Sequence, residues 1–320
     1  MSSKSLVICD EDVNYAARLA AFFNGKRELA FQVKICGNPV EMQNVLTDNA
    51  KSILLLNESF VQDELVKEWQ GELLILSETK RTSNYEEKER LFKYQSGSKI
   101  LLQILEKCGE QNMDGVWRVR KSSPGRVIGF FSPVRRVGQT TFAMTKSKEL
   151  SKDCNVLYIN LEAYAGCEGL FSQDQDRTMS TLLYYAKQES DNVGMILTTV
   201  VCSKNGVDYI PPVKNSEDLH AVTKDEWLWL FRELLRNSIY DVLVLDLSEC
   251  IQGLYEILKF CDEVYMLTAD DQTAASKIKQ YEQDLRQMGY LEVAERMIRC
   301  DIRRTIAGKN SGQSGPVKRN

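Results

Sequence analysis

The chain has 320 residues, 43% of them hydrophobic and 27% charged, which is ordinary for a globular protein with room for two domains. Its formal net charge of −4 argues against a dedicated nucleic-acid-binding protein, and no apolar run approaches the ~18–20 residues of a membrane span. Nine cysteines without a C-x-x-C pair, together with a single histidine, argue against a zinc site and suit a reducing cytosol.

Residues 1–108 alternate short apolar runs with helical patterns, which predicts an α/β domain built on a parallel sheet. The runs expected to form strands are Leu6–Cys9, Phe31–Cys36, Ile53–Leu56 and Leu73–Leu76. Helices are expected where Ala16, Leu19, Ala20 and Phe23 form one stripe, and over 97–107.

Polar residues follow these expected strands. Asp10, Glu11 and Asp12 come directly after the first strand, and the later positions of interest are Asn57, Ser77 and Lys93. The three acidic residues have two interpretations: they cap the following helix, or they belong to a functional pocket.

This arrangement resembles a response-regulator receiver domain of the flavodoxin-like class. In that family, acidic residues after the first strand hold Mg²⁺, an Asp after the third strand accepts phosphate, and a Ser or Thr and a Lys complete the pocket. Asn57 stands at the phosphoacceptor position, and an amide is a far weaker nucleophile than a carboxylate. The resemblance therefore implies a receiver-like domain that lacks the phosphoacceptor and serves as a docking or dimerisation module.

A polar, glycine-containing stretch at 109–125 predicts an interdomain linker, and a second α/β alternation fills 126–306. Strands are expected at Val127–Phe131, Val156–Asn160, Met195–Thr199, Val242–Asp246 and Glu263–Leu267. Helices are expected from Thr140 and at Thr178–Gln188, Lys224–Asn237 and Thr273–Met288. The Gly-, Ser- and Lys-rich segment 307–320 predicts a disordered tail.

A phosphate-binding loop without its lysine follows the strand expected at Val127–Phe131. The usual form, G-x-x-x-x-G-K-[ST], would place Gly at 133 and Lys at 139, where this chain has Pro133 and Gln139. Gly138 and Thr140 are kept, so the backbone could still approach phosphate and the hydroxyl could still ligate Mg²⁺. The missing lysine removes charge that would stabilise the transition state of phosphoryl transfer.

Residues 126–305 resemble the MinD/ParA-type ATPases, whose deviant loop reads K-G-G-x-G-K-T-T. Val137, Gly138, Thr140 and Thr141 match its end, whereas Val134 replaces the first lysine, Arg135 and Arg136 replace the glycines, and Gln139 replaces the second lysine. Asn160 and Glu162 match the family's D-x-D, and Asp246 ends its Y-D-x-x-x-x-D strand.

The resemblance implies ATP and Mg²⁺ as cofactors. The expected nucleotide contacts are Arg135, Arg136, Val137, Gly138, Gln139, Thr140 and Thr141. The expected metal-site residues are Thr140, Glu162 and Asp246, with Asp246 catalytic if the enzyme is active. Three interpretations stay open: a vestigial loop that binds nothing, nucleotide binding without efficient turnover, and competent hydrolysis.

A receiver-like domain ahead of a MinD/ParA-like domain resembles the CpaE/TadZ family of pilus-assembly proteins, as do the Ser132-Pro133 lead-in and the degenerate loop. This resemblance implies a cytoplasmic protein of a bacterial Flp/Tad (type IVb) pilus system. It would form a homodimer, contact the secretion machinery, and reach the membrane or pole through partners, without direct membrane insertion. The alternatives are an active positioning or partitioning ATPase and a regulator of another pathway.

Overall fold

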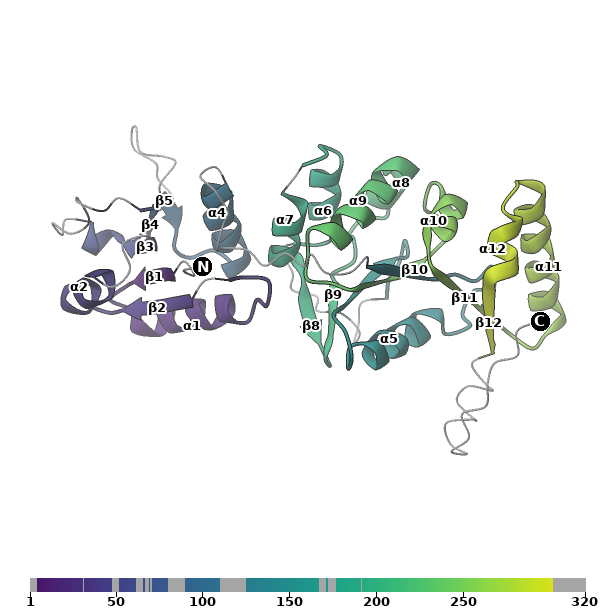
Figure 1. Ribbon diagram of the computed structural model, residues 1–320, viewed down its shortest axis with the longest axis horizontal. Coiled ribbons are helices and arrows are strands. Elements are labelled where there is room, and N and C mark those ends of the chain that lie inside the picture. Colours follow the sequence, from purple (N-terminus) through teal and green to yellow (C-terminus); the bar gives the residue numbers. More distant parts are fainter. Residues whose placement is uncertain are drawn as a thin grey trace, which may run out of the picture. The chain divides into compact units, whose positions relative to one another are not determined.

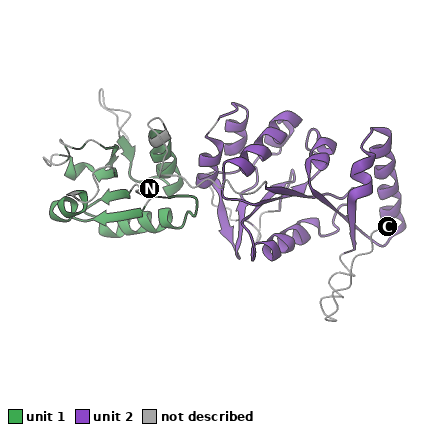
Figure 2. Cartoon of the chain, viewed as in Figure 1, with its two compact units in different colours: residues 1–119 green, residues 120–320 purple. Residues whose placement is uncertain are grey.

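The computed structural model describes residues 5–30, 32–47, 52–61, 66, 69, 71–79, 90–109, 125–166, 171, 177–190 and 192–301. The chain divides into two compact units, residues 1–119 and 120–320 (Figure 2). The tail expected at 307–320 and most of the linker expected at 109–125 lie outside the described residues.

The first unit contains a five-stranded parallel sheet in the order β2-β1-β3-β4-β5 (Figure 1). This is the strand order of flavodoxin-like doubly wound folds. Its strands are β1 (Ser5–Cys9), β2 (Gln32–Cys36), β3 (Ile53–Asn57), β4 (Leu73–Ser77) and β5 (Arg90–Phe92). Its helices are α1 (Val13–Asn24), α2 (Pro39–Thr47), the short 3₁₀ helix η1 (Glu58–Phe60) and α4 (Gly97–Gly109).

The first core lies on both faces of this sheet. Ile53, Leu54, Leu55 and Leu56 are all buried, as a strand covered on both faces requires. Helix α1 buries the stripe predicted from its sequence, because its apolar residues recur at helical spacing. The four predicted strands of this unit therefore form, and each ends at the same edge of the sheet.

The second unit contains a seven-stranded sheet in the order β12-β11-β6-β10-β7-β9-β8, parallel except for β8. The strands are β6 (Arg126–Phe130), β7 (Val156–Leu161), β8 (Cys202–Lys204), β9 (Val207–Ile210), β10 (Val242–Leu247), β11 (Glu263–Thr268) and β12 (Met297–Asp301). The helices are α5 (Gln139–Leu150), α6 (Met179–Ala186), α7 (Val193–Val200), α8 (Glu217–His220), α9 (Lys224–Arg236), α10 (Leu254–Phe260), α11 (Gln272–Gln287) and α12 (Leu291–Arg296). Both units are thus α/β with mainly parallel sheets, as predicted.

Helices cover both faces of the second sheet: α5 lies on one face, and α6, α7 and α9 lie on the other (Figure 1). Ile128, Phe130, Tyr158 and Val244 form part of the core, against which Phe142 of α5 packs. Among the described residues, no helix is both long and apolar enough to span a membrane.

The strand predicted at Met195–Thr199 is wrong, because this segment lies in α7. Every residue of α7 is buried, and the helix packs against α6 and α9. A fully buried helix has no polar face, so its sequence reads as a continuous apolar run just as a buried strand does. The strand that pairs with β7 is instead β9.

Candidate functional site

The parallel register of three central strands brings the predicted site residues to one edge of the second sheet. Asp246 of β10 pairs with Phe130 of β6 on one side and with Asn160 of β7 on the other. The chain leaves β6 through the β6–α5 loop, residues 131–138, and enters α5 at Gln139. Parallel α/β sheets bind ligands at this carboxyl edge.

The β6–α5 loop has the backbone conformation of an anion-binding turn. Arg136 has φ 61° and Gly138 has φ 79°, so both are left-handed, although only glycine adopts this region without strain. Gly138 offers α5 no side-chain cap, and alternating left-handed turns before a helix present N–H groups to an anion. Ser132 anchors the loop: its hydroxyl donates to the Leu267 carbonyl at 2.6 Å and accepts from the Val134 N–H at 3.0 Å.

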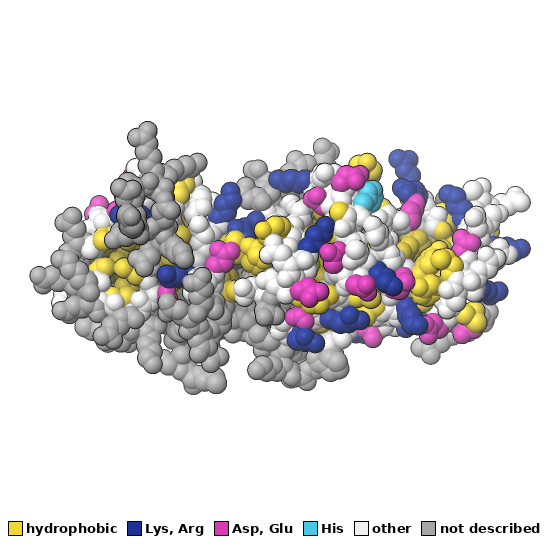
Figure 3. Space-filling model, turned by 90° about the horizontal axis from the view of Figure 1, so that it is seen from above, with side chains coloured by type: hydrophobic (Ala, Val, Ile, Leu, Met, Phe, Trp, Pro, Cys, Tyr) yellow, Lys and Arg dark blue, Asp and Glu magenta, His cyan; other side chains and the backbone are white. Residues whose placement is uncertain are grey.

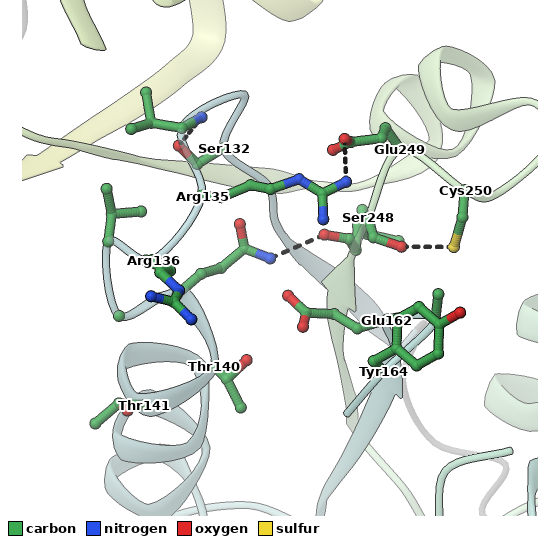
Figure 4. Close-up of a pocket in the computed structure, with 16 residues that line it drawn as sticks. Ser132, Arg135, Arg136, Thr140, Thr141, Glu162, Tyr164, Ser248, Glu249 and Cys250 are labelled. Atoms are coloured by element: carbon green, nitrogen blue, oxygen red, sulfur yellow. Dashed lines mark hydrogen bonds and ion pairs between the residues drawn. The ribbon is translucent and has the colours of Figure 1, made fainter. Parts of the chain in front are cut away.

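A pocket of about 580 Å³ opens in front of this loop (Figure 4). Its lining residues come from the loop and the start of α5, from the end of β7, and from the end of β10. They are Ser132, Val134, Arg135, Arg136, Val137, Gly138, Gln139, Thr140, Thr141, Glu162, Ala163, Tyr164, Leu247, Ser248, Glu249 and Cys250. All seven expected nucleotide contacts therefore line one cavity, together with Glu162, which directly follows β7.

Gln139, which stands where the resemblance places a lysine, is bonded to β10. Its Nε2 donates to Asp246 Oδ1 at 2.7 Å and to the carbonyl of Leu247 at 2.8 Å. The amide is uncharged, and both of its N–H donors are used within the protein. This side chain consequently offers the pocket no positive charge and no spare donor.

Asp246 is fully buried and is surrounded by donors. Its Oδ2 accepts from the Tyr158 hydroxyl at 2.7 Å and from Asn160 Nδ2 at 3.1 Å. Burial raises the pKa of Asp246, whereas the hydrogen bonds from Gln139, Tyr158 and Asn160 oppose that rise. We refer to Asp246, Gln139, Tyr158 and Asn160 as the Asp246 cluster.

Glu162 projects into the pocket and is half-buried. Burial raises the pKa of Glu162 to about 7, the neighbouring Asp246 charge adds to the rise, and Arg135 opposes it. Arg135 itself forms an ion pair with Glu249 across the mouth of the pocket (Figure 4). Arg136 is exposed, and no described carboxylate pairs with it.

Two residues of this site carry no signal in the sequence. Tyr158 lies within an apolar strand, where an aromatic residue is expected to be core, yet its hydroxyl contacts Asp246. Glu249 lies three residues after Asp246 in the turn beyond β10 and reaches Arg135 from there. Only the folded chain shows that these two residues belong to the site.

The polar residues of the first unit converge only in part. Lys93 Nζ forms a buried ion pair with Asp10 at 2.9 Å, and Asn57 Nδ2 donates to Asp10 Oδ2 at 3.3 Å. Asp12 caps α1 by accepting from the Tyr15 N–H at 3.0 Å. Both interpretations of the acidic residues therefore apply, each to a different residue.

The side chains of the other two residues predicted in that pocket make no described hydrogen bond to the ion pair, although the Ser77 carbonyl accepts from the Lys93 backbone N–H at 2.7 Å. Glu11 is exposed, and the Ser77 hydroxyl bonds within its own turn to Thr79. Burial lowers the pKa of Lys93, but the adjacent Asp10 carboxylate outweighs burial and leaves the pKa of Lys93 raised. The centre of this pocket is thus filled by the lysine ammonium.

The residues of the second unit fit some cofactor groups better than others. Three features suit the phosphates of a nucleotide: the two residues of the β6–α5 loop with left-handed backbone conformation, the uncapped N-terminus of α5, and the two arginines at the pocket. Mg²⁺ is bound by carboxylate or hydroxyl oxygens. Thr140 and Glu162 line the pocket and offer such oxygens, whereas the Asp246 carboxylate is buried and accepts hydrogen bonds from Gln139, Tyr158 and Asn160.

No family model matches the sequence, and a search of curated proteins finds no match. Among solved structures, the chain is similar to a ParA family ATPase from Chlorobium tepidum TLS, at 17% identity and a TM-score of 0.46 over 56% of this chain and 74% of that chain. It is similar to a putative plasmid partition protein from Borrelia burgdorferi B31 bound to AMPPNP, at 16% identity and a TM-score of 0.41 over 60% and 84% of the two chains.

A third similar structure is the cobyrinic acid a,c-diamide synthase from Mycobacterium smegmatis with bound ATP analog and magnesium. It has 12% identity and a TM-score of 0.41 over 61% of this chain and 88% of that chain. These neighbours are ParA-family ATPases and related enzymes.

Proposed function

We propose that this protein is a cytoplasmic scaffold, or a nucleotide-dependent localisation factor, of a bacterial Flp/Tad (type IVb) pilus assembly system. Its second unit binds ATP in the pocket described above and hydrolyses it very slowly or not at all. The observation that carries this proposal is the side chain of Gln139, which is neutral and bonded to Asp246 and to the Leu247 carbonyl.

Binding is supported by the backbone of the β6–α5 loop. Its left-handed residues keep the turn that a phosphate-binding loop needs, even where arginine replaces glycine at 136. Strained conformations of non-glycine residues cluster at active sites and ligand-binding sites, which favours a retained binding function for this loop. The two arginines at the pocket supply positive charge for phosphate oxygens.

Slow hydrolysis is supported by what the same loop lacks. A lysine at 139 would place an ammonium beside the transferred phosphoryl group, whereas the Gln139 amide places none. Removing one preorganised electrostatic contact lowers the rates of other enzymes by ~10²–10³. Val134 stands where the family pattern has its first lysine, and Gln139 stands where it has its second, so both of the usual lysine charges are missing.

A docking role for the first unit is supported by its closed polar centre. We propose that this unit is a receiver-like domain in which the Lys93 ammonium, held by Asp10 and beside Asn57, occupies the place of phosphorylation chemistry. Without a carboxylate at 57, the unit cannot form an acyl phosphate there. It would serve as a surface for a second copy or for a secretion-machinery protein.

The proposed setting includes a homodimer that reaches the membrane or pole through partners. On the face shown in Figure 3, basic and acidic side chains are interspersed over the described surface, which does not favour a nucleic-acid partner. Fluorescent fusions in cells with and without the pilus genes test the setting. Discrete foci that disappear with the pilus genes are expected, and foci that persist would contradict the pilus role.

Calorimetric titration with ATP and with ADP, read together with phosphate release and light scattering, tests the biochemical part. We expect saturable ATP binding with turnover far below that of ordinary ATPases, whose typical rate constants are about 1–10³ s⁻¹. Dimers that form only with ATP would favour a switch, and dimers independent of ATP a static scaffold. Absence of nucleotide binding would contradict the proposal.

An active MinD/ParA-type positioning or partitioning ATPase is the second candidate. It is favoured by Arg135 and Arg136, whose permanent charges lie at the pocket and could replace the missing lysines. Brisk phosphate release that falls on Asp246→Ala and on Thr140→Ala would support this candidate. The same assay on wild-type protein therefore separates the two functions.

A further inference from the structure

We propose that Cys9 and Cys36 form a redox modification site in the first unit. A hydroperoxide oxidises the two buried thiols to a disulfide that joins β1 and β2, and small thiols reduce that disulfide again. The site does not involve the nucleotide pocket, so this inference stands apart from the proposed nucleotide binding. Disulfides that form in a reducing cytosol are usually transient and redox-sensing, which is the behaviour assigned to this one.

The register of the first sheet brings the two cysteines together. Cys9 is the last residue of β1, Cys36 is the last residue of β2, and the two are partners in the parallel pairing of these strands. Their Sγ atoms lie 2.7 Å apart. A disulfide needs an S–S bond of about 2.05 Å and Cα atoms about 4.4–6.8 Å apart, and neighbouring strands are about 4.8 Å apart. The sulfur atoms therefore have to approach by less than about 1 Å, and the strands keep their pairing.

The contact between the two thiols favours ionisation of one of them. A hydrogen bond from Cys9 lowers the pKa of Cys36, although burial and the Glu41 carboxylate oppose this change. The same hydrogen bond and burial raise the pKa of Cys9. Because the thiolate is the nucleophilic form of cysteine, Cys36 is the residue that attacks the oxidant. Cys9 is the neighbouring thiol that converts the first product into a disulfide.

The oxidation consumes one hydroperoxide, here written as hydrogen peroxide. The Cys36 thiolate attacks one peroxide oxygen, so that an S–O bond forms, the O–O bond breaks, and hydroxide leaves and takes a proton to become water. The Cys9 sulfur then attacks the Cys36 sulfenic acid: the S–S bond forms, the S–O bond breaks, and the thiol proton leaves with hydroxide as a second water. The two thiols lose two electrons, and the peroxide gains two. Two small thiols return these electrons by thiol–disulfide exchange.

Burial restricts which oxidants reach the pair. Cys9 and Cys36 are 0% and 2% exposed, and they share a core cluster with Met42 and Leu46 of α2. Strand β2 is at the edge of the sheet, and α2 packs against it. Local opening of this edge would expose Cys36 to a small peroxide before the rest of the core opens. The half-buried Cys154 is more accessible, but its Sγ contacts the Leu150 carbonyl.

The disulfide would form beside the polar centre of the first unit. Asp10 directly follows Cys9, its backbone N–H donates to the Cys36 carbonyl at 3.1 Å, and its carboxylate pairs with Lys93. The cross-link would therefore fix the two strands next to this ion pair. It would also close a segment in which the two cysteines are 27 positions apart, and such a closure restricts the unfolded chain.

Peptide mapping of the full chain under non-reducing conditions tests the proposal. The folded protein is treated with hydrogen peroxide, the remaining thiols are alkylated in acidic denaturant, and the chain is digested with trypsin. We expect a disulfide-linked pair of peptides, residues 5–18 and 35–51, that is two hydrogen atoms lighter than the two peptides together. Dithiothreitol should separate them. Recovery of Cys9 and Cys36 as alkylated thiols or as sulfinic acids, or linked to other cysteines, would overturn the proposal.

Thermal unfolding tests whether the disulfide is compatible with the native strands. We expect peroxide to raise the Tm of the wild-type first unit by at least about 4 °C. The gain should be absent in Cys9→Ala and Cys36→Ala, whose folding is checked by circular dichroism. Cys154→Ala, the matched control in the second unit, should keep both the linked peptides and the gain. A Tm that stays constant or falls while the linked peptides form would overturn the site, and this comparison on wild-type protein decides if either variant fails to fold.

Discussion

At residue 139 the choice between an amide and an ammonium decides the chemistry of the pocket. The Gln139 amide donates hydrogen bonds to Asp246 and to the Leu247 carbonyl. A lysine side chain at this position is long enough to reach the same two acceptors. We therefore expect Gln139→Lys to raise phosphate release by at least about tenfold. The gain should stay below the ~10²–10³ of a complete electrostatic contact, because Val134 and Arg135 still depart from the family pattern.

Gln139→Met is the matched control, since methionine has a similar length but neither charge nor donors. Single-turnover phosphate release on the three proteins distinguishes added charge from changed packing. An equal rise in both variants would show that the amide blocks the pocket and that the charge is irrelevant.

The raised pKa of Glu162 predicts that the stability of the folded protein depends on pH. Burial, followed by the Asp246 charge, raises the pKa of Glu162 to about 7, compared with about 4.3 in an unfolded chain. Because the pKa of Glu162 is higher in the folded state, the carboxyl is protonated in the native state and ionised in the unfolded chain between about pH 4.3 and pH 7. The contribution of this proton to the free energy of unfolding is complete below about pH 4.3 and is lost as pH rises through 7.

Glu162→Gln mimics the protonated acid, so its advantage in Tm over wild type should grow between pH 5 and pH 8. Thermal unfolding at a series of pH values measures it. Glu295→Gln, at an exposed position on α12, controls for the change in net charge. A constant difference in Tm across this range would contradict the raised pKa.

At the scale of elements, the carboxyl ends of β1 and β5 are joined by the Asp10–Lys93 ion pair. Asp10 and Lys93 are 0% and 3% exposed, and removing one partner of such a pair leaves a buried, uncompensated charge. We expect Lys93→Met to lower the free energy of unfolding by about 3–5 kcal/mol. Denaturant titration of the full chain measures the loss.

The double variant Asp10→Asn with Lys93→Met removes both charges and should recover most of that loss. The same unit contains a second ion pair, Arg90–Glu58, whose side chains are 43% and 38% exposed. Glu58→Ala is therefore expected to lower the free energy of unfolding by no more than about 1 kcal/mol. Equal losses at the two pairs would mean that burial does not govern the strength of the Asp10–Lys93 interaction.

Most strands of the two sheets could be predicted because buried parallel strands are short, continuous apolar runs with turn residues between them. The strands β5, β8 and β12 were not predicted. The same reasoning failed at Met195–Thr199, where helix α7 is buried all around. It did not identify β9, whose sequence Val207–Ile210 includes Asp208, a strand residue bonded to Ser203 and Tyr240. Hydrophobic periodicity arises from the alternation of buried and exposed positions. It therefore cannot distinguish a helix from a strand when the element has no exposed face.

Part of the candidate site could likewise be predicted from the sequence, and part could not. The loop and Asp246 could be placed together because strand–loop–helix order and parallel register bring the ends of β6 and β10 to one edge. Contacts between side chains from separate strands could not be predicted, as with Tyr158 and Asp246. Cys9 and Cys36 are a second example: strand pairing brings their Sγ atoms to 2.7 Å although the spacing of the cysteines suggested no pair.

At the scale of the whole molecule, the chain contains two compact units, each with its own hydrophobic core. Each unit contains one of the two polar sites described above. The Asp246 cluster and the pocket belong to residues 120–320, and the Asp10–Lys93 pair belongs to residues 1–119. Multidomain chains commonly unfold in more than one step, so each unit should report its own ligand and its own substitutions.

We expect calorimetric unfolding of the full chain to show two transitions, of which only one responds to ATP. A ligand that binds only the native state at a hundred times its Kd stabilises the unit that holds it by about 2.7 kcal/mol. Lys93→Met should lower the other transition, because the buried ion pair lies outside the nucleotide pocket. If ATP and Lys93→Met moved the same transition, the pocket and the ion pair would belong to one cooperative unit, and the division of roles between a docking unit and a nucleotide-binding unit would be wrong.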